Sequence, residues 1–166
     1  WFRTGDIGNL DGDGFLSITD RKKELIKTSG GKLIPPQPIE NKLKAYALVA
    51  QAAMVGDKHK FACVLLSPNF AALEAWANGQ GIAAGDRAAL VKDPKVVKLY
   101  QEIVDKVNAE LPSYESMKRM SVVADEWSIE EGELTPSMKL KRRVVEKKYA
   151  KEIAEFYADE ATSKVR

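Results

Sequence analysis

Residues 19–32 read TDRKKELIKTSGGK, and the rest of this 166-residue chain is organised around them. Four lysines, one arginine, one aspartate and one glutamate surround a short apolar step, Leu25-Ile26. The stretch closes on Gly30-Gly31, where the absence of a Cβ lets another molecule approach the backbone. Cations beside glycines suit a polyanionic ligand such as a nucleotide. A solvated, lysine-rich edge strand has the same composition and stays open as the alternative.

The overall composition is that of one ordinary globular domain with a small appendage. Hydrophobic residues make up 45% of the chain, charged residues make up 30%, and the net charge of +2 gives no bulk attraction for nucleic acid. The sole cysteine, Cys63, excludes an internal disulfide, which fits a reducing cytosol. No apolar run approaches the length of a membrane span. Because the chain begins at Trp1 without an initiator methionine, we expect it to be a fragment.

The first residues predict a β-hairpin. Residues 15–19 have the composition of a strand, and the preceding NLDGDG at residues 9–14 is a strong turn signal. The same loop imitates a calcium-binding EF-hand, because its acidic residues fall at ligand positions. Helices should flank such a loop, but the flanks here resemble strands, and its last position holds Asp20 in place of glutamate. The hairpin turn is therefore favoured, and no metal site is predicted.

The remainder predicts an α+β fold, a small mixed sheet packed with helices. Two apolar runs, 49–55 and 61–67, are joined by GDKHK and predict a hairpin of core strands with His59 exposed in its turn. Periodicity and capping residues predict helices over residues 69–78 and 93–111. Further predicted elements are a short strand over 24–28, a helix from near Pro38, a strand over 117–124 and a long helix from about Ser137.

Three segments, in order along the chain, resemble motifs of the AMP-forming acyl- and aryl-CoA synthetases. ITDRKKELIKTSGGKLIPPQPIE at residues 18–40 resembles the hinge motif of that adenylate-forming superfamily. WFRTGDIG at residues 1–8 resembles the motif whose aspartate binds ribose, and GELTPSMKLKRR at residues 132–143 resembles the motif that carries the catalytic lysine. TSGGK followed by PPQPIE, together with LKRR, points to the long-chain fatty-acid branch.

The resemblance implies a division of the chain into three parts. Residues 1–20 would be the tail end of the large AMP-binding domain, residues 21–23 the hinge, and residues 24–166 the mobile C-terminal lid domain. The family's Gly-rich phosphate loop and acyl pocket lie upstream of the first motif. The missing N-terminal domain of the same chain would therefore be the lid's partner, and this fragment alone would be inactive.

The resemblance also implies roles for residues in adenylate formation. Asp6 would accept hydrogen bonds from both ribose hydroxyls, whereas the bare sequence also allows a turn-capping aspartate. Arg21 would contact the nucleotide through its planar guanidinium. Lys139 would be the catalytic lysine that offsets the repulsion between a fatty carboxylate and the α-phosphate.

A second set of residues would act in thioester formation. Lys23 would be the hinge residue whose backbone rotation exchanges the two faces of the lid. Lys27 and Gly30 would then face the active site, with Gly30 leaving room for the pantetheine arm of CoA. From the residues alone, Lys27 could equally be a plain exposed lysine.

The implied enzyme is a long-chain fatty-acid–CoA ligase that uses ATP, Mg²⁺ and CoA. It would convert a fatty acid to its acyl-adenylate and then transfer the acyl group to CoA. The enzyme would be cytoplasmic, and a peripheral contact with the membrane stays open. An aryl- or short-chain acid ligase is the alternative within the superfamily. Outside it, the basic run KLKRR at residues 139–143 could belong to a non-catalytic module that binds membrane or nucleic acid.

Overall fold

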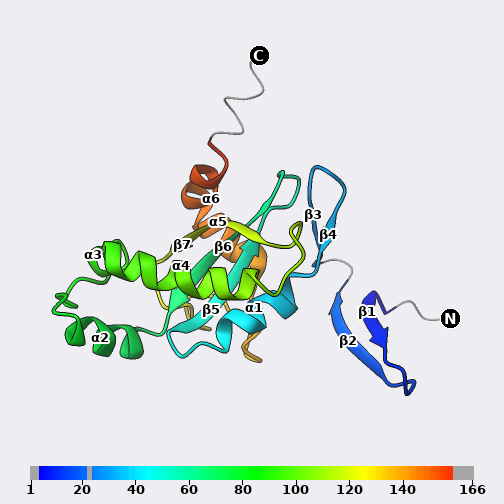
Figure 1. Ribbon diagram of the computed structural model, residues 1–166, viewed down its shortest axis with the longest axis horizontal. Helices are drawn as coiled ribbons and strands as arrows, with labels where there is room; N and C mark the ends of the chain where they lie inside the picture. Colours follow the sequence, from blue (N-terminus) through cyan, green and yellow to red (C-terminus); the bar gives the residue numbers. More distant parts are fainter. Residues whose placement is uncertain (1–3, 22–23, 159–166) are drawn as a thin grey trace, which may run out of the picture.

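A mixed three-stranded sheet lies at the centre of the computed structural model, which describes residues 4–21 and 24–158, without the side chains of residues 19–21. The strand order is β5-β6-β7 (Figure 1). β5 (Val49–Val55) and β6 (Ala62–Pro68) are antiparallel, whereas β7 (Met117–Val122) runs parallel to β6. The predicted α+β fold with a small mixed sheet is confirmed.

Helices cover both faces of this sheet, because alternate strand residues point to opposite sides. From Ala52 to Leu66, the even-numbered residues of β5 and β6 belong to a core cluster with α1 (Pro36–Lys44), α2 (Phe70–Gly79) and α4 (Pro94–Asn108), which also includes Val49. From Ala53 to Leu65, the odd-numbered residues of the two strands belong to a second cluster with α5 (Arg142–Lys148) and α6 (Ala150–Phe156). The short helix α3 (Arg87–Leu90) connects α2 to α4. The sheet is thus the middle of three layers.

The predicted N-terminal hairpin is also confirmed. β1 (Asp6–Leu10) and β2 (Leu16–Arg21) are antiparallel and lie to one side of the central sheet (Figure 1). The Asp11 carboxylate accepts the backbone N–H groups of Asp13 at 3.0 Å and Phe15 at 2.9 Å, so it closes the turn. Strands flank this loop where an EF-hand has helices.

A second, two-residue hairpin precedes α1. β3 (Ile26–Lys27) lies within the predicted strand and pairs with β4 (Leu33–Ile34), which the sequence did not predict. Helix α1 begins at Pro36, two residues before the predicted start. None of the helices in the described parts of the chain is long and apolar enough to cross a membrane.

Two expectations were wrong, one for the final helix and one for His59. The final helix begins at Arg142 instead of Ser137, because Met138 has a left-handed φ of +59° that no right-handed helix accommodates. Tyr149 then separates α5 from α6. His59 is half-buried instead of exposed, since its ring stacks on Tyr157 with 3.6 Å between the ring centroids.

Candidate active site

Lys139 lies on a tight, exposed loop that precedes α5. Leu134 and Leu140 form an antiparallel bridge that closes this loop. Within it, the Thr135 N–H donates to the Lys139 carbonyl at 2.8 Å, and the Lys139 N–H donates to Thr135 Oγ1 at 3.0 Å. The backbone of Lys139 is therefore fixed on both sides, while its side chain is exposed.

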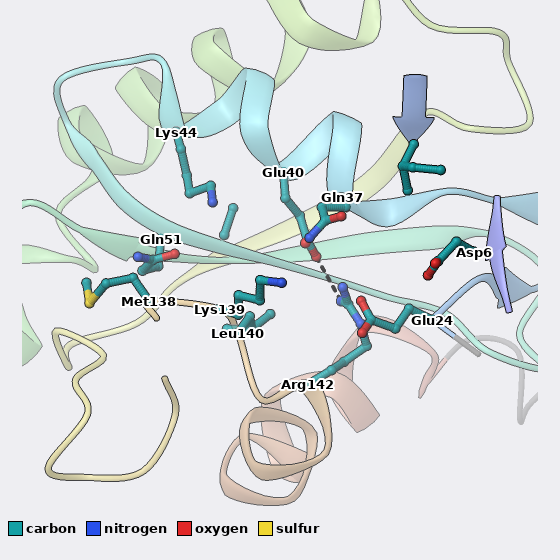
Figure 2. A pocket seen from close by; sticks show the side chains of 12 residues that line it. Asp6, Glu24, Gln37, Glu40, Lys44, Gln51, Met138, Lys139, Leu140 and Arg142 are labelled. Carbon is teal, nitrogen blue, oxygen red and sulfur yellow. Dashed lines mark hydrogen bonds and ion pairs between the residues drawn. The ribbon is translucent and has the colours of Figure 1, made fainter. Parts of the chain in front are cut away.

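The Lys139 side chain lines a hollow of about 320 Å³ between α1, the start of β5 and its own loop (Figure 2). Figure 2 shows Glu40 and Lys44 of α1 across from Lys139. The charged residues that line the hollow are Asp6, Glu24, Glu40, Lys44, Lys139 and Arg142. Asp6 and Lys139, which lie near opposite ends of the sequence, thus line the same hollow. A carboxylate that can accept hydrogen bonds from hydroxyl groups, beside several cations, suits a nucleotide.

A buried ion pair connects α1 to α5 beside Lys139. The Glu40 carboxylate, in a residue that is 4% exposed, accepts the Met54 N–H at 2.7 Å and Arg142 Nη1 at 2.8 Å through the same oxygen. Arg142 Nη1 also donates to the Met54 carbonyl. Because β5 is an edge strand, these backbone groups of Met54 have no neighbouring strand to bind. The ion pair therefore completes the hydrogen bonding of this edge.

The sequence prediction missed Glu40 altogether and treated Arg142 only as part of a basic run. One signal was available, because Glu40 follows Ile39 and precedes Leu43 by one helical turn, which places it beside the apolar face of α1. Its partner is 102 residues away, which no local pattern reveals.

A second buried ion pair holds the same loop from its other side. Glu133 is 1% exposed and accepts Lys148 Nζ at 2.7 Å and the Ser128 N–H at 3.3 Å. Burial alone would raise the pKa of Glu133, but the hydrogen bonds from Lys148 and the backbone outweigh it and the pKa is lowered. The bond to Glu133 likewise raises the pKa of Lys148. Both groups are charged at neutral pH.

Lys27 lies on β3, exposed, at the other end of β5. Its N–H donates to Asp57 Oδ1 at 3.1 Å, and its carbonyl accepts the Lys58 N–H at 2.8 Å. The next residues continue the attachment, because the Ser29 N–H donates to the His59 carbonyl at 2.8 Å. The Lys27 segment is thus fixed to the turn that joins β5 to β6.

Gly30 is exposed in the turn after β3. A Cβ built on Gly30 would meet no atom within 4 Å, so open space lies beside this backbone. Gly31, by contrast, has a φ of +79°, which favours glycine at that position. The turn therefore requires its second glycine, and the first one leaves an open approach.

The Lys139 and Gly30 segments lie at different places on the domain. Lys139 shares its hollow with Gln51 and Ala52, near the start of β5, whereas the Gly30 turn is bonded past the end of that strand. Four residues separate Gln51 from the end of β5 at Val55, so about 13 Å of strand lies between the two places at a rise of about 3.3 Å per residue. The two segments therefore lie on separate parts of the domain surface.

The structure bears less directly on the other two predicted residues. Arg21 lies opposite Asp6 in the register of the hairpin, so its backbone is close to the hollow, but its side chain lies outside the description. Lys23 lies outside the described residues. The nucleotide contact and the hinge therefore stay predictions. Among the described residues, no group of three or more histidine, cysteine or acidic side chains could hold a metal ion.

The fold is that of the C-terminal domain of adenylate-forming enzymes. Residues 23–161 match the family described as the AMP-binding enzyme C-terminal domain, and the chain belongs to that family. The chain is 38% identical over 161 residues to long-chain-fatty-acid–CoA ligase FadD15 of Mycobacterium tuberculosis, with 96% of this chain and 27% of that protein covered. It is 39% identical over 180 residues to long-chain-fatty-acid–CoA ligase ACSBG2 of Gallus gallus, with 98% of this chain and 24% of that protein covered.

Solved structures agree with this assignment. The adenylation domain of a carboxylate reductase from Mycobacterium chelonae matches with a TM-score of 0.74 and 26% identity, over 95% of this chain and 23% of that one. O-succinylbenzoate CoA synthetase from Bacillus subtilis, in complex with AMP, matches with a TM-score of 0.54 and 27% identity, over 86% of this chain and 23% of that one. The chain spans about a quarter of the length of the curated relatives it matches. The resemblance inferred from the three motifs is confirmed.

Proposed function

We propose that this chain is the C-terminal portion of an AMP-forming long-chain fatty-acid–CoA ligase. The observation that carries the proposal is the hollow that Asp6 and Lys139 line together. The names of the curated relatives, long-chain-fatty-acid–CoA ligases, support the substrate class over an aryl or short-chain acid. An upstream domain supplies the phosphate loop, the acyl pocket and most of the Mg²⁺ ligands.

In the first half-reaction, a carboxylate oxygen of the fatty acid attacks the α-phosphorus of ATP. The bond from that phosphorus to the pyrophosphate oxygen breaks, and acyl-adenylate forms. Two anions approach each other in this step, so the ammonium of Lys139 stabilises the transition state without transferring a proton. The Asp6 carboxylate orients the nucleotide by accepting hydrogen bonds from the ribose hydroxyls, and Arg21 adds a contact to the nucleotide.

In the second half-reaction, the lid turns about Lys23 and presents the segment with Lys27 and Gly30. The CoA thiol loses its proton to solvent and its sulfur attacks the acyl carbon, and the bond from that carbon to the phosphate oxygen breaks, so AMP leaves. The open space beside Gly30 gives the thin pantetheine arm a path along the backbone. We assign residues 1–20 to the end of the large domain, residues 21–23 to the hinge and residues 24–166 to the lid. The start of the family match at residue 23 supports this division.

The test compares the two half-reactions in the complete ligase after Lys139→Ala. We expect adenylate formation, measured by pyrophosphate exchange, to fall by about 100- to 1000-fold, as when a transition-state donor is removed. Thioester formation from preformed acyl-adenylate should stay near the wild-type rate. Lys141→Ala is the matched control, because Lys141 is also an exposed lysine of this basic run. Equal losses in both half-reactions would contradict the assignment.

The non-catalytic alternative, a basic helix on a membrane surface, has less support. Such a helix needs a free apolar side, but Val145, Tyr149 and Phe156 of this segment are buried in the core. A membrane contact through α5 and α6 would therefore depend mainly on charge. We keep it only as a peripheral interaction that supplements the ligase function.

A further inference from the structure

We propose that Glu40 and Arg142 are positioning residues for Lys139. Their buried ion pair fixes the start of α5 against the open edge of β5, and this sets where the Lys139 ammonium lies during adenylate formation. The inference rests on the proposed function of Lys139. It assigns a role to two residues for which the motifs imply none, Glu40 at the end of the hinge motif and Arg142 three residues after Lys139.

The Glu40–Arg142 ion pair holds Arg142 to one residue of the edge strand β5. The Glu40 carboxylate and Arg142 Nη1 bind each other at 2.8 Å, and between them they bind both the N–H and the carbonyl of Met54. The side chains are only 6% and 18% exposed, so water competes weakly for these bonds. Arg142 is thereby held to one residue of a core strand, and any shift of Arg142 along β5 would break at least two hydrogen bonds.

Lys139 and Arg142 are close together along the chain. Only Leu140 and Lys141 separate Lys139 from Arg142. Leu140 is held in its bridge to Leu134, and the Lys141 N–H donates to the Glu133 carbonyl at 2.7 Å. With both intervening residues fixed, the position of Arg142 is transmitted to Lys139 through a short and ordered backbone. The Lys139 side chain itself remains exposed for a ligand.

A buried ion pair is a poor source of net stability, because the desolvation of both ions offsets most of their attraction. A well-packed apolar pair would hold α1 to α5 equally well. The ion pair differs in that its geometry is directional, and misplacement of a catalytic group by about 1 Å costs about 100-fold in rate. A role in placing Lys139 therefore accounts for the pair better than stability does.

Arg142 also lines the hollow, so a direct contact with substrate has to be separated from a positioning role. In the structure, Nη1 of its guanidinium donates hydrogen bonds to the Glu40 carboxylate and to the Met54 carbonyl. A residue that acts through Lys139 loses its effect when Lys139 is absent, whereas a residue that touches substrate does not. A double-mutant cycle distinguishes the two cases.

The experiment uses the complete ligase with Arg142→Gln, Glu40→Gln and Lys139→Ala, singly and with Lys139→Ala combined with each of the other two. We expect the Arg142 and Glu40 variants to lower kcat for pyrophosphate exchange by about 10- to 100-fold. The KM for ATP and the thioester half-reaction should change little. In the Lys139→Ala background, neither substitution should lower adenylate formation further.

Two further variants keep the test decisive. Arg142→Lys retains a cation and should recover part of the lost rate, and it serves if Arg142→Gln does not fold. Lys42→Ala is the control, because it removes an ion pair of the same helix, at 2.6 Å to Glu110, that is exposed and remote from the hollow. It should leave both half-reactions unchanged.

The outcomes separate this inference from the proposed function. If Lys139→Ala spares adenylate formation, the proposed function fails and the inference fails with it. If Lys139→Ala impairs adenylate formation but folded Arg142 and Glu40 variants keep the wild-type rate, only the positioning role is overturned. It is also overturned if Arg142→Gln lowers the rate by the same factor with and without Lys139, or lowers both half-reactions equally.

Discussion

Replacing Lys148 with Met should destabilise the domain more than replacing its partner Glu133 with Gln. Removing Lys148 leaves a carboxylate whose side chain is 1% exposed without its cation, whereas removing the carboxylate leaves an ammonium whose side chain is 35% exposed. Water can solvate the second group but not the first. The two substitutions delete the same 2.7 Å contact, so their difference measures the burial of the group left behind.

The expected magnitudes follow from this asymmetry. Breaking a fully buried pair costs about 3–5 kcal/mol, and the partial exposure of Lys148 lowers this to about 2–4 kcal/mol for Lys148→Met. Glu133→Gln should cost about 1–2 kcal/mol, since Gln still accepts the Ser128 N–H. In Glu133→Gln, Lys148 also retains its ion pair with Asp125, at 3.4 Å. The double variant should recover part of the loss, because it strands neither charge.

The assay is urea unfolding of the 166-residue chain at two pH values. In the wild type, Glu133 has a lowered pKa, so its contribution is present above the unfolded pKa of about 4.3 and is lost as pH falls through the folded value. In Lys148→Met, the hydrogen bond and the charge of Lys148 no longer lower the pKa of Glu133, so this pKa rises relative to the wild type and the penalty should be smaller at about pH 5 than at about pH 8. A larger cost for Glu133→Gln, or a penalty independent of pH, would refute the reasoning.

Three further predictions concern the loop, the hinge and the core. Met138 has a φ of +59° and is 55% exposed, so Met138→Gly should relieve about 1–2 kcal/mol of strain, offset in part by the greater entropy of the unfolded chain. Met138→Val should destabilise the domain in the same urea-unfolding assay. Lys23→Pro fixes φ near −65°; in the complete ligase one half-reaction should survive and the other fail, and wild-type rates for both would place the pivot elsewhere. Leu65→Ala, at a fully buried position of β6, should cost about 2–5 kcal/mol by urea unfolding, and a cost under about 1 kcal/mol would contradict its place in the core.

Elements with local signals were predictable from the sequence. Asn69 caps α2 by accepting the Ala72 N–H at 3.3 Å, and Asp93 caps α4 by accepting the Lys95 N–H at 2.8 Å. Both residue types favour this position because their side chains replace a missing helical hydrogen bond. The core strands were equally clear, since both are continuous apolar runs. Each of these signals lies within the element that it specifies.

Features that depend on distant contacts could not be predicted. His59 sits in a polar segment of the sequence, but Tyr157 from the far end of the chain covers its ring. The sequence prediction started the last helix too early, because the left-handed φ of Met138 and the contacts of Arg142 with Glu40 and Met54 leave no trace in the periodicity. The site shows the same limit. The motif located Lys139, while the hollow that it shares with Asp6 and the ion pair beside it required the structure.

In the proposed mechanism two places on this domain serve two successive half-reactions, and the ratio of thioester formation to adenylate formation distinguishes them. The measurement compares Gly30→Leu with Lys139→Ala in the complete ligase. The fold should tolerate Gly30→Leu, because the space beside Gly30 is open and its φ is not left-handed. The account predicts that Gly30→Leu lowers this ratio by about 100-fold while adenylate formation continues, and that Lys139→Ala raises it. If both substitutions impair the same half-reaction, the two places do not have separate roles and the account is contradicted.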